Sequence, residues 1–133
     1  MMWLWISLAI AGPADRVTRL LEAGRVTEAV DFGEQWIEKH AGDDRAQAVT
    51  KSLENAVYQQ AILMNTTESF QGFRERFPDS KHIKRAKELE ARAGWDQISK
   101  RGSSRIDVEN WVRDYDHIIH KPESLQLLAD RAY

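Results

Sequence analysis

The chain has 133 residues, of which 30% are charged and 42% hydrophobic, and its formal net charge is −2. This balance is typical of a folded globular domain, and it gives no global electrostatic attraction to nucleic acid or to an anionic membrane. No cysteine is present, which excludes disulfides, thiolate metal sites, cysteine nucleophiles and a lipid anchor on an N-terminal cysteine.

Residues 1–14 carry no charged side chain. Their apolar run, Trp3 to Ala11, is much shorter than the roughly 20 residues that span a bilayer. Small residues suited to signal-peptidase cleavage lie at its end, at Ala9/Ala11 or Gly12/Ala14. We therefore expect a signal peptide over residues 1–14, export of the chain, and no stable membrane span in the mature protein. The alternative is a buried or membrane-surface first helix.

Amphipathic helices are predicted in the chain that follows. The first runs from Asp15 to Ala23-Gly24, where glycine can end a helix in the left-handed conformation. The second runs from Arg25 to His40. Its apolar face is formed by residues at i, i+3 and i+7, which are Ala29, Phe32 and Trp36.

A long third helix is predicted after a break at Gly42-Asp43-Asp44. Asp44 and Gln47 have the spacing of a capping box, in which each side chain satisfies a backbone donor at the helix start. The helix reaches about Met64. Its apolar positions are Val49, Leu53, Ala56, Val57 and Ala61.

A short aromatic helix comes next, and a capping box of Asn65 and Glu68 is expected to open it. Its apolar face carries Phe70, Phe73 and Phe77, again at i, i+3 and i+7. Pro78 ends this helix, because proline lacks an N–H and its ring clashes with the preceding turn.

The next helix is expected to start at Lys81, capped by Asp79 and Ser80, and to continue to about Lys100. Gly94 lies inside it and could mark a bend, since glycine costs about 1 kcal/mol relative to alanine in a helix. The apolar positions of this helix are Ile83, Ala86, Leu89 and Ala93.

Two further helices complete the chain. Gly102-Ser103-Ser104 is expected to end one helix and cap the next. In that helix the i, i+3, i+7 spacing recurs at Val108, Trp111 and Tyr115. Lys121-Pro122 then separates a last helix, from Glu123 to Tyr133.

The three apolar patterns recur at offsets of 41 and 38 residues, and the longer helices between them match at an offset of 37. Periods in this range are typical of stacked helical hairpins, each of which buries its apolar face against the next. The sequence therefore predicts an all-α protein of stacked antiparallel helix hairpins. Residues 15–133 would form about three diverged helix pairs plus a C-terminal helix. The alternative is an ordinary bundle of amphipathic helices.

Two segments resemble the tetratricopeptide repeat. Leu20 to Ala29 (LLEAGRVTEA) is similar to the repeat's core. Thr67 to Ala86, which contains the sequence FPDS, is similar to the diverged repeat of bacterial envelope proteins of this type. The resemblance covers about residues 15–120. It implies a short right-handed superhelix of helix pairs, located in the periplasm, that binds a protein or peptide without catalysis of its own.

One cluster has residue types that bind metals: Asp114, Asp116, His117 and His120. His117 and His120 could share a helical face, and imidazole with carboxylate suits zinc or a similar ion. The alternative is an ordinary helix end, where Asp and His are common for local backbone reasons.

Two other groups have open interpretations. Tyr58 and Trp95 occupy equivalent places on successive long helices, either as packing residues or in a peptide groove. Basic residues gather around the start of the helix predicted from Lys81, either as a binding patch or as a solvated charged face; they are Arg74, Arg76, Lys81, His82, Lys84 and Arg85.

No phosphate-binding glycine loop, nucleophile elbow or HExxH motif is present in the sequence. We therefore expect no enzyme, no catalytic residue, no cofactor and no nucleic-acid partner. The expected function is a non-catalytic interaction or scaffold module of a bacterial cell envelope, with a protein or peptide as its partner. The alternatives are the N-terminal part of a longer repeat array, or a metal-binding protein that uses Asp116, His117 and His120.

Overall fold

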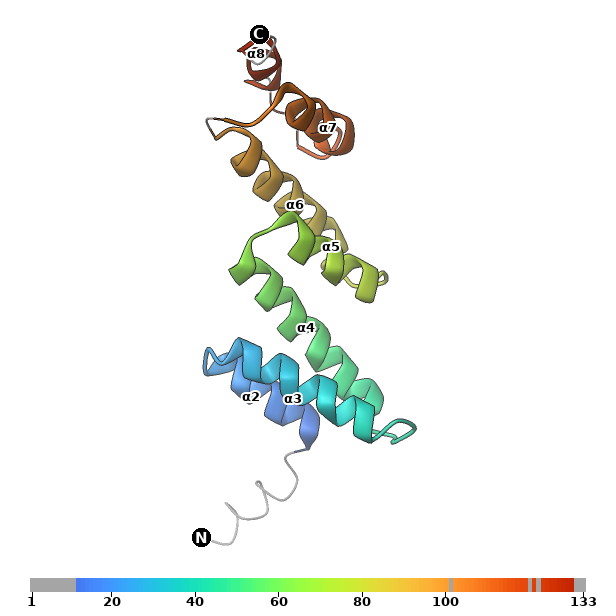
Figure 1. Ribbon diagram of the computed structural model, residues 1–133. Helices are drawn as coiled ribbons and strands as arrows, with labels where there is room; N and C mark the ends of the chain where they lie inside the picture. Colours follow the sequence, from blue (N-terminus) through green and yellow to red (C-terminus); the bar gives the residue numbers. More distant parts are fainter. Residues whose placement is uncertain (1–11, 101, 120, 122, 131–133) are drawn as a thin grey trace, which may run out of the picture. The chain divides into compact units, whose positions relative to one another are not determined.

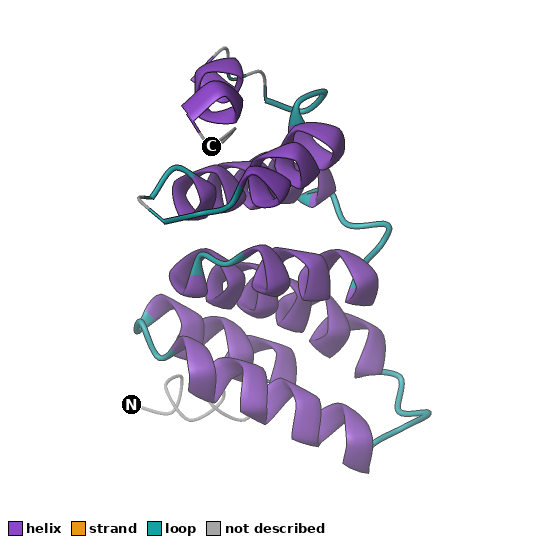
Figure 2. Cartoon of the chain, turned by 45° about the horizontal axis from the view of Figure 1, so that its top comes forward, coloured by secondary structure: helices purple, strands orange, loops and turns teal. Residues whose placement is uncertain are grey.

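The computed structural model describes residues 12–100, 102–119, 121 and 123–130. These residues form helices and turns and contain no strand (Figures 1 and 2), which confirms the predicted all-α class. The expected signal peptide lies almost wholly outside them. Their helices are α2 Pro13–Glu22, α3 Val26–Lys39, α4 Ala46–Met64, α5 Thr67–Arg76, α6 Ile83–Ile98, α7 Arg105–Tyr115 and α8 Glu123–Asp130.

The chain divides into two compact units, residues 1–60 and 61–133, and the division falls within α4. In the first unit α2 packs on α3. In the second, α5 packs on α6, α6 on α7, and α7 on α8. Within the described residues, no helix combines the length and the apolarity needed to cross a bilayer.

The turn between α2 and α3 has the predicted glycine C-cap. Gly24 has a φ of 78°, in the left-handed region. Its N–H donates to the Leu21 carbonyl, and the Arg25 N–H donates to the Leu20 carbonyl, at 3.0 and 2.9 Å. This pair of bonds is the Schellman motif, which satisfies two carbonyls that the helix end would otherwise leave unpaired.

The apolar face of α3 differs from the prediction. Ala29 is fully buried, together with Val30 and Gly33. Phe32 and Trp36 are only half-buried. The Arg16 guanidinium lies 4.6 Å from the centre of the Phe32 ring, and Trp36 stacks on His40 with ring centres 4.3 Å apart. The core therefore contacts the small residues of α3. The rings of Phe32 and Trp36 lie at the edge of the core, where polar side chains cover them.

The start of α4 is also displaced from the predicted capping box. The helix begins at Ala46, so its N-cap position is Arg45 and not Asp44. The preceding turn is held by Asp43, whose carboxylate accepts the Arg45 N–H at 2.8 Å and pairs with the Arg45 guanidinium at 3.0 Å. These contacts with Arg45 lower the pKa of Asp43 to about 2. Buried residues of α4 include the predicted Val49, Leu53, Ala56 and Ala61, and also Tyr58.

The capping box before α5 is one residue later than predicted. Asn65 adopts a φ of 51° and donates its N–H to the Ala61 carbonyl at 2.9 Å, so it ends α4. Thr66 is the N-cap of α5: its hydroxyl accepts the Ser69 N–H at 3.0 Å, and the Ser69 hydroxyl accepts the Thr66 N–H at 3.2 Å. Glu68 then lies in the first turn, where its charge interacts favourably with the helix dipole.

The predicted cap before α7 is confirmed and has the same form. The Ser104 hydroxyl accepts the Asp107 N–H at 3.2 Å, and the Asp107 carboxylate accepts the Ser104 N–H at 3.0 Å. Thr66 and Ser104 are 38 residues apart, as are Ser69 and Asp107. The two capping boxes therefore share the offset that relates the aromatic faces of α5 and α7.

Those aromatic faces are buried to similar extents at equivalent positions. Phe70 and Phe73 on α5 are buried, and so are Val108 and Trp111 on α7. The third member is half-buried in both helices, at Phe77 and Tyr115. Half-buried apolar residues extend the Ile98–Val108–Trp111 cluster; they are Trp95, Val112, Tyr115, Ile119, Leu127 and Leu128.

The helix α6 begins at Ile83, two residues later than predicted. In the turn before it, the Ser80 hydroxyl accepts the His82 N–H at 3.1 Å. Its buried face includes the predicted Ala86 and Ala93. However, Leu89 is half-buried while Glu90 is buried. The helix also continues through Gly94 without interruption.

Gly94 is required for close packing. A Cβ atom at Gly94 would lie 3.1 Å from Cδ1 of Trp111 and 3.3 Å from Cγ2 of Thr67. The Trp111 ring is held in place, because its Nε1–H donates to the Ala91 carbonyl at 2.9 Å. At Gly72, on α5, a Cβ atom would meet nothing within 4 Å.

Gly94→Ala is therefore expected to lower the free energy of unfolding by about 1–2 kcal/mol, because overpacking exceeds the gain in helix propensity. Gly72→Ala, the matched control, is expected to raise it by about 0.5–1 kcal/mol. Urea unfolding of both variants measures the difference. A stabilised Gly94→Ala variant would contradict the close approach of α6 and α7.

Candidate functional site

The metal-binding hypothesis gains no support from the described residues. His120 lies outside them, and no group of three His, Asp or Glu residues among them could hold a metal ion. Asp114 instead pairs with the Arg113 guanidinium at 3.0 Å, and the hydrogen bond from Arg113 lowers the pKa of Asp114.

Tyr58 and Trp95 have packing roles in the structure. Tyr58 is buried. Trp95 is half-buried, and its ring lies 4.9 Å from the ring of Trp111, with the Lys121 ammonium 5.8 Å from its centre. Both observations agree with packing rather than with a peptide groove.

The predicted basic patch is partly neutralised. Arg85 pairs with Glu88 at 3.1 Å on the surface of α6. Arg74 pairs with the buried Glu90 carboxylate at 2.7 Å, through Nη2, and at 2.9 Å through Nε. With these ion pairs the surface carries both positive and negative charges, so it is not uniformly cationic.

Glu90 is the centre of a polar network that joins three helices. The Tyr115 hydroxyl of α7 donates to Oε2 of Glu90 at 2.7 Å, while Arg74 of α5 binds Oε1. Gln71 donates to the Tyr115 hydroxyl at 3.5 Å. Burial and the adjacent Glu90 carboxylate raise the pKa of Tyr115 to about 12, so Tyr115 keeps its proton and remains a donor. The network lines a cleft of about 550 Å³ that also includes Lys87 and His117.

A second cleft, of about 420 Å³, lies between α6 and α7. Its apolar residues include Gly94, Ile98 and Trp111, which are buried. The polar residues that α7 contributes are spaced at i, i+3 and i+7, so they share one helical face; they are Asp107, Asn110 and Asp114.

Two carboxamides flank this cleft, Gln97 from α6 and Asn110 from α7. Both side chains are exposed, and within the described part of the chain neither forms a side-chain hydrogen bond. A carboxamide offers one acceptor and two donor hydrogens, which is the complement of a peptide group. The cleft therefore presents unused hydrogen-bonding groups beside an apolar surface.

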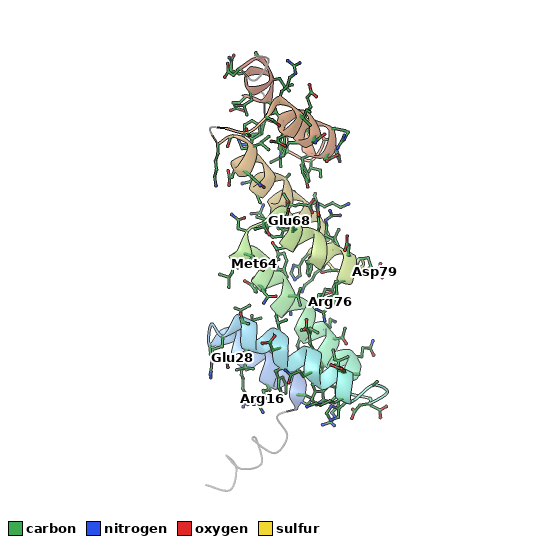
Figure 3. All side chains as sticks on the ribbon, in the orientation of Figure 1. Arg16, Glu28, Met64, Glu68, Arg76 and Asp79 are labelled. Atoms are coloured by element: carbon green, nitrogen blue, oxygen red, sulfur yellow. The ribbon has the colours of Figure 1, made fainter. Side chains whose placement is uncertain are left out.

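A third cleft, of about 310 Å³, adjoins the second. The two share Gln97 of α6 and Lys100, which follows the end of that helix. The third cleft extends to the start of α5, at Thr66 and Glu68, and to Asp96 of α6. We call the two clefts together the α6 groove, and all of its residues belong to the second unit. Figure 3 labels Glu68 at the start of α5 and Met64, an exposed apolar residue, at the end of α4.

Sequence reasoning did not single out Gln97 or Asn110. A signal was present in α7, because Asp107, Asn110 and Asp114 repeat at i, i+3 and i+7 directly beside the apolar pattern of Val108 and Trp111. That arrangement indicates a polar ridge at the border of a packed face. The residues that α6 contributes to the groove have no comparable pattern in the sequence. The groove therefore became apparent only from the packing of α6 against α7.

No protein-family model, no curated protein and no solved structure matches this chain. The functional argument therefore rests on the groove and on the chemistry of its residues.

Proposed function

We propose that the chain is a non-catalytic, tetratricopeptide-like interaction module that binds an extended peptide segment of a partner protein in the α6 groove. The observation that carries the proposal is the pair of carboxamides, Gln97 and Asn110, beside the buried Trp111 and without a side-chain partner in the described residues. A ligand that covers these exposed carboxamides removes their water, so it must supply hydrogen-bond partners, and an extended backbone can do so with its N–H and C=O groups.

The size and composition of the groove agree with this function. Its larger cleft, about 420 Å³, is within the usual range of roughly 300–1,000 Å³ for ligand sites. Such sites combine an apolar surface with a few polar groups that orient the ligand. Here Ile98 and Trp111 supply the apolar surface, while Gln97 and Asn110 supply orientation.

The repeat architecture in this proposal is supported by features that recur together. The capping boxes of α5 and α7 are 38 residues apart, and both helices bury the first two members of their apolar patterns. At the offset of 37, Leu53 on α4 corresponds to Glu90 on α6, and both are buried. Recurrence of caps and burial at nearly equal offsets favours stacked hairpins, and we extend this to a right-handed superhelix by the tetratricopeptide resemblance.

The peptide-binding proposal predicts that loss of the two carboxamides weakens binding. Displayed random dodecapeptides would be selected on the immobilised full chain, and the dissociation constants of the enriched peptides measured by fluorescence anisotropy. Gln97→Ala/Asn110→Ala is expected to raise these constants about tenfold or more, since each lost hydrogen bond contributes about 0.5–1.5 kcal/mol.

A matched control removes two exposed carboxamides from the first unit, in the variant Gln35→Ala/Gln47→Ala. This control is expected to bind the selected peptides as the parent chain does. Failure to enrich any peptide, or enrichment of peptides that bind the groove variant equally well, would contradict the proposal.

Export to the periplasm of a bacterial envelope is a further part of the proposal. It rests on the uncharged apolar sequence of residues 1–14 and on the envelope-type repeat resemblance. Intact mass of the chain recovered from a periplasmic extract would test it, because a signal peptide is removed on export. A recovered chain that still starts at Met1 would contradict cleavage.

A further inference from the structure

The charged residues that line the α6 groove are mainly acidic. Across its two clefts the charged residues are four carboxylates, Glu68, Asp96, Asp107 and Asp114, and one ammonium group, Lys100. The neighbouring cleft around Glu90 has a different balance, since three cations, Arg74, Lys87 and Arg113, line it with two carboxylates, Glu90 and Asp114. Asp114 lines both this cleft and the α6 groove, and the excess of carboxylates over cations is found in the α6 groove.

These carboxylates are available to a ligand to different degrees. Glu68 and Asp96 are exposed, and within the described residues neither forms an ion pair. Asp114 pairs with Arg113, but both side chains are largely solvent-exposed, at 49% and 70%, so the contact is easily exchanged. Asp107 uses Oδ2 to cap α7 and keeps Oδ1 for another donor.

The arrangement does not suit a bound metal ion. The acidic residues of the groove come from three helices, and no three of the described acidic and histidine residues converge on one point. Separated carboxylates along an open groove instead favour a ligand with separated positive charges.

We propose that the partner segment is cationic: an extended peptide with lysine or arginine side chains about three residues apart, whose main chain bonds Gln97 and Asn110. This inference rests on the proposed peptide-binding function. Asp107 and Asp114 are seven residues apart on α7, which corresponds to about 10 Å along the helix axis. In a polyproline II segment, side chains three residues apart lie on one face and about 9 Å apart, so two successive cationic side chains match this spacing.

The test compares three fluorescein-labelled decapeptides that differ only in the residue placed at every third position: lysine, serine or glutamate. Binding to the full chain is measured by anisotropy. The lysine peptide is expected to bind at least about tenfold more tightly than the serine peptide, and the glutamate peptide most weakly. Its advantage is expected to shrink as salt rises, because the charges on both sides are exposed to solvent.

The variant Glu68→Gln/Asp96→Asn/Asp114→Asn removes three exposed carboxylates from the groove without altering the cap at Asp107. It is expected to weaken binding of the lysine peptide about tenfold or more. The control is Asp79→Asn, an exposed carboxylate beyond the other end of α5 (Figure 3), which is expected to leave binding unchanged.

The outcomes separate the two proposals. If serine or glutamate peptides bind as tightly as the lysine peptide and Gln97→Ala/Asn110→Ala weakens them, the cationic inference is overturned and the peptide-binding function stands. If the lysine peptide binds the triple-carboxylate variant unchanged, the inference is likewise overturned. If none of the three peptides binds, and the random library also yields no binder that depends on the carboxamides, both proposals fail.

Discussion

Phe73→Ala is expected to lower the free energy of unfolding by about 3–5 kcal/mol, the usual cost of truncating a buried phenylalanine. The Phe73 ring is fully buried, and it packs against Phe77 with ring centres 5.7 Å apart and against His82 at 6.5 Å. The truncation removes contacts with α5 and with the start of α6, and it leaves a cavity that a packed core fills only partly. Urea unfolding followed by circular dichroism measures the cost.

Phe32→Ala is the informative control for this prediction. Phe32 is the counterpart of Phe73 in the sequence pattern, but its ring is half-buried under the Arg16 guanidinium. Because less apolar surface is lost, we expect a cost of about 1–2 kcal/mol. Equal costs at Phe32 and Phe73 would contradict the different burial of α3 and α5. A cost below about 1 kcal/mol at Phe73 would contradict the buried aromatic core of the second unit.

Helix ends were the most predictable part of this fold, because their chemistry is local. Gly24 and Ser104 were identified from the sequence, since a C-cap glycine and a serine with an acidic residue at N3 act within a few residues. The incorrect prediction of Asn65 as the N-cap of α5 also has a local cause. Asn65 and Thr66 are both suitable N-caps, and the choice depends on which residue leaves α4 in the left-handed conformation. The conformation at the end of α4 therefore decides which of the two residues is the N-cap of α5.

Burial was predicted less well, because a period of 3.6 residues locates an apolar face but not its centre. On α3 the core contacts Ala29 and Gly33, whereas Phe32 and Trp36 lie at its edge. On α6 Glu90 is not among the predicted apolar positions, yet it is buried. Its burial depends on Arg74, 16 residues away, and on Tyr115, 25 residues away, and neither contact leaves a periodic signal.

The α6 groove was not predicted from the sequence, because it too depends on packing between residues that are distant in the chain. Gln97 and Asn110 belong to different helices, and they flank one cleft because Trp111 fits against Gly94 without an intervening Cβ atom. A change that separates α6 from α7 should therefore affect the groove as well as stability. Gly94→Ala is such a change, and it connects the folding energy of this unit to its binding surface.

Removal of one partner of the Glu90 network is the second change with a large expected effect. Arg74→Met is expected to lower the free energy of unfolding by about 3 kcal/mol, because it leaves a buried carboxylate with one neutral donor, Tyr115. The side chain of Glu90 is 3% exposed and that of Arg74 29%. The cost therefore comes mainly from the desolvated Glu90 charge and less from the lost arginine contacts.

The double variant Arg74→Met/Glu90→Leu separates this explanation from simple loss of packing. Leu53, the residue of α4 that corresponds to Glu90, is an apolar residue buried to the same degree, so leucine is a suitable replacement. We expect the double variant to recover to within about 1 kcal/mol of the parent chain, since an apolar replacement of a buried ion pair is often neutral or stabilising. Arg92→Met, which removes an exposed arginine of α6, controls for the loss of charge and should change stability by less than about 0.5 kcal/mol. A double variant as unstable as Arg74→Met alone would mean that the arginine side chain itself, and not the buried charge of Glu90, holds α5 to α6.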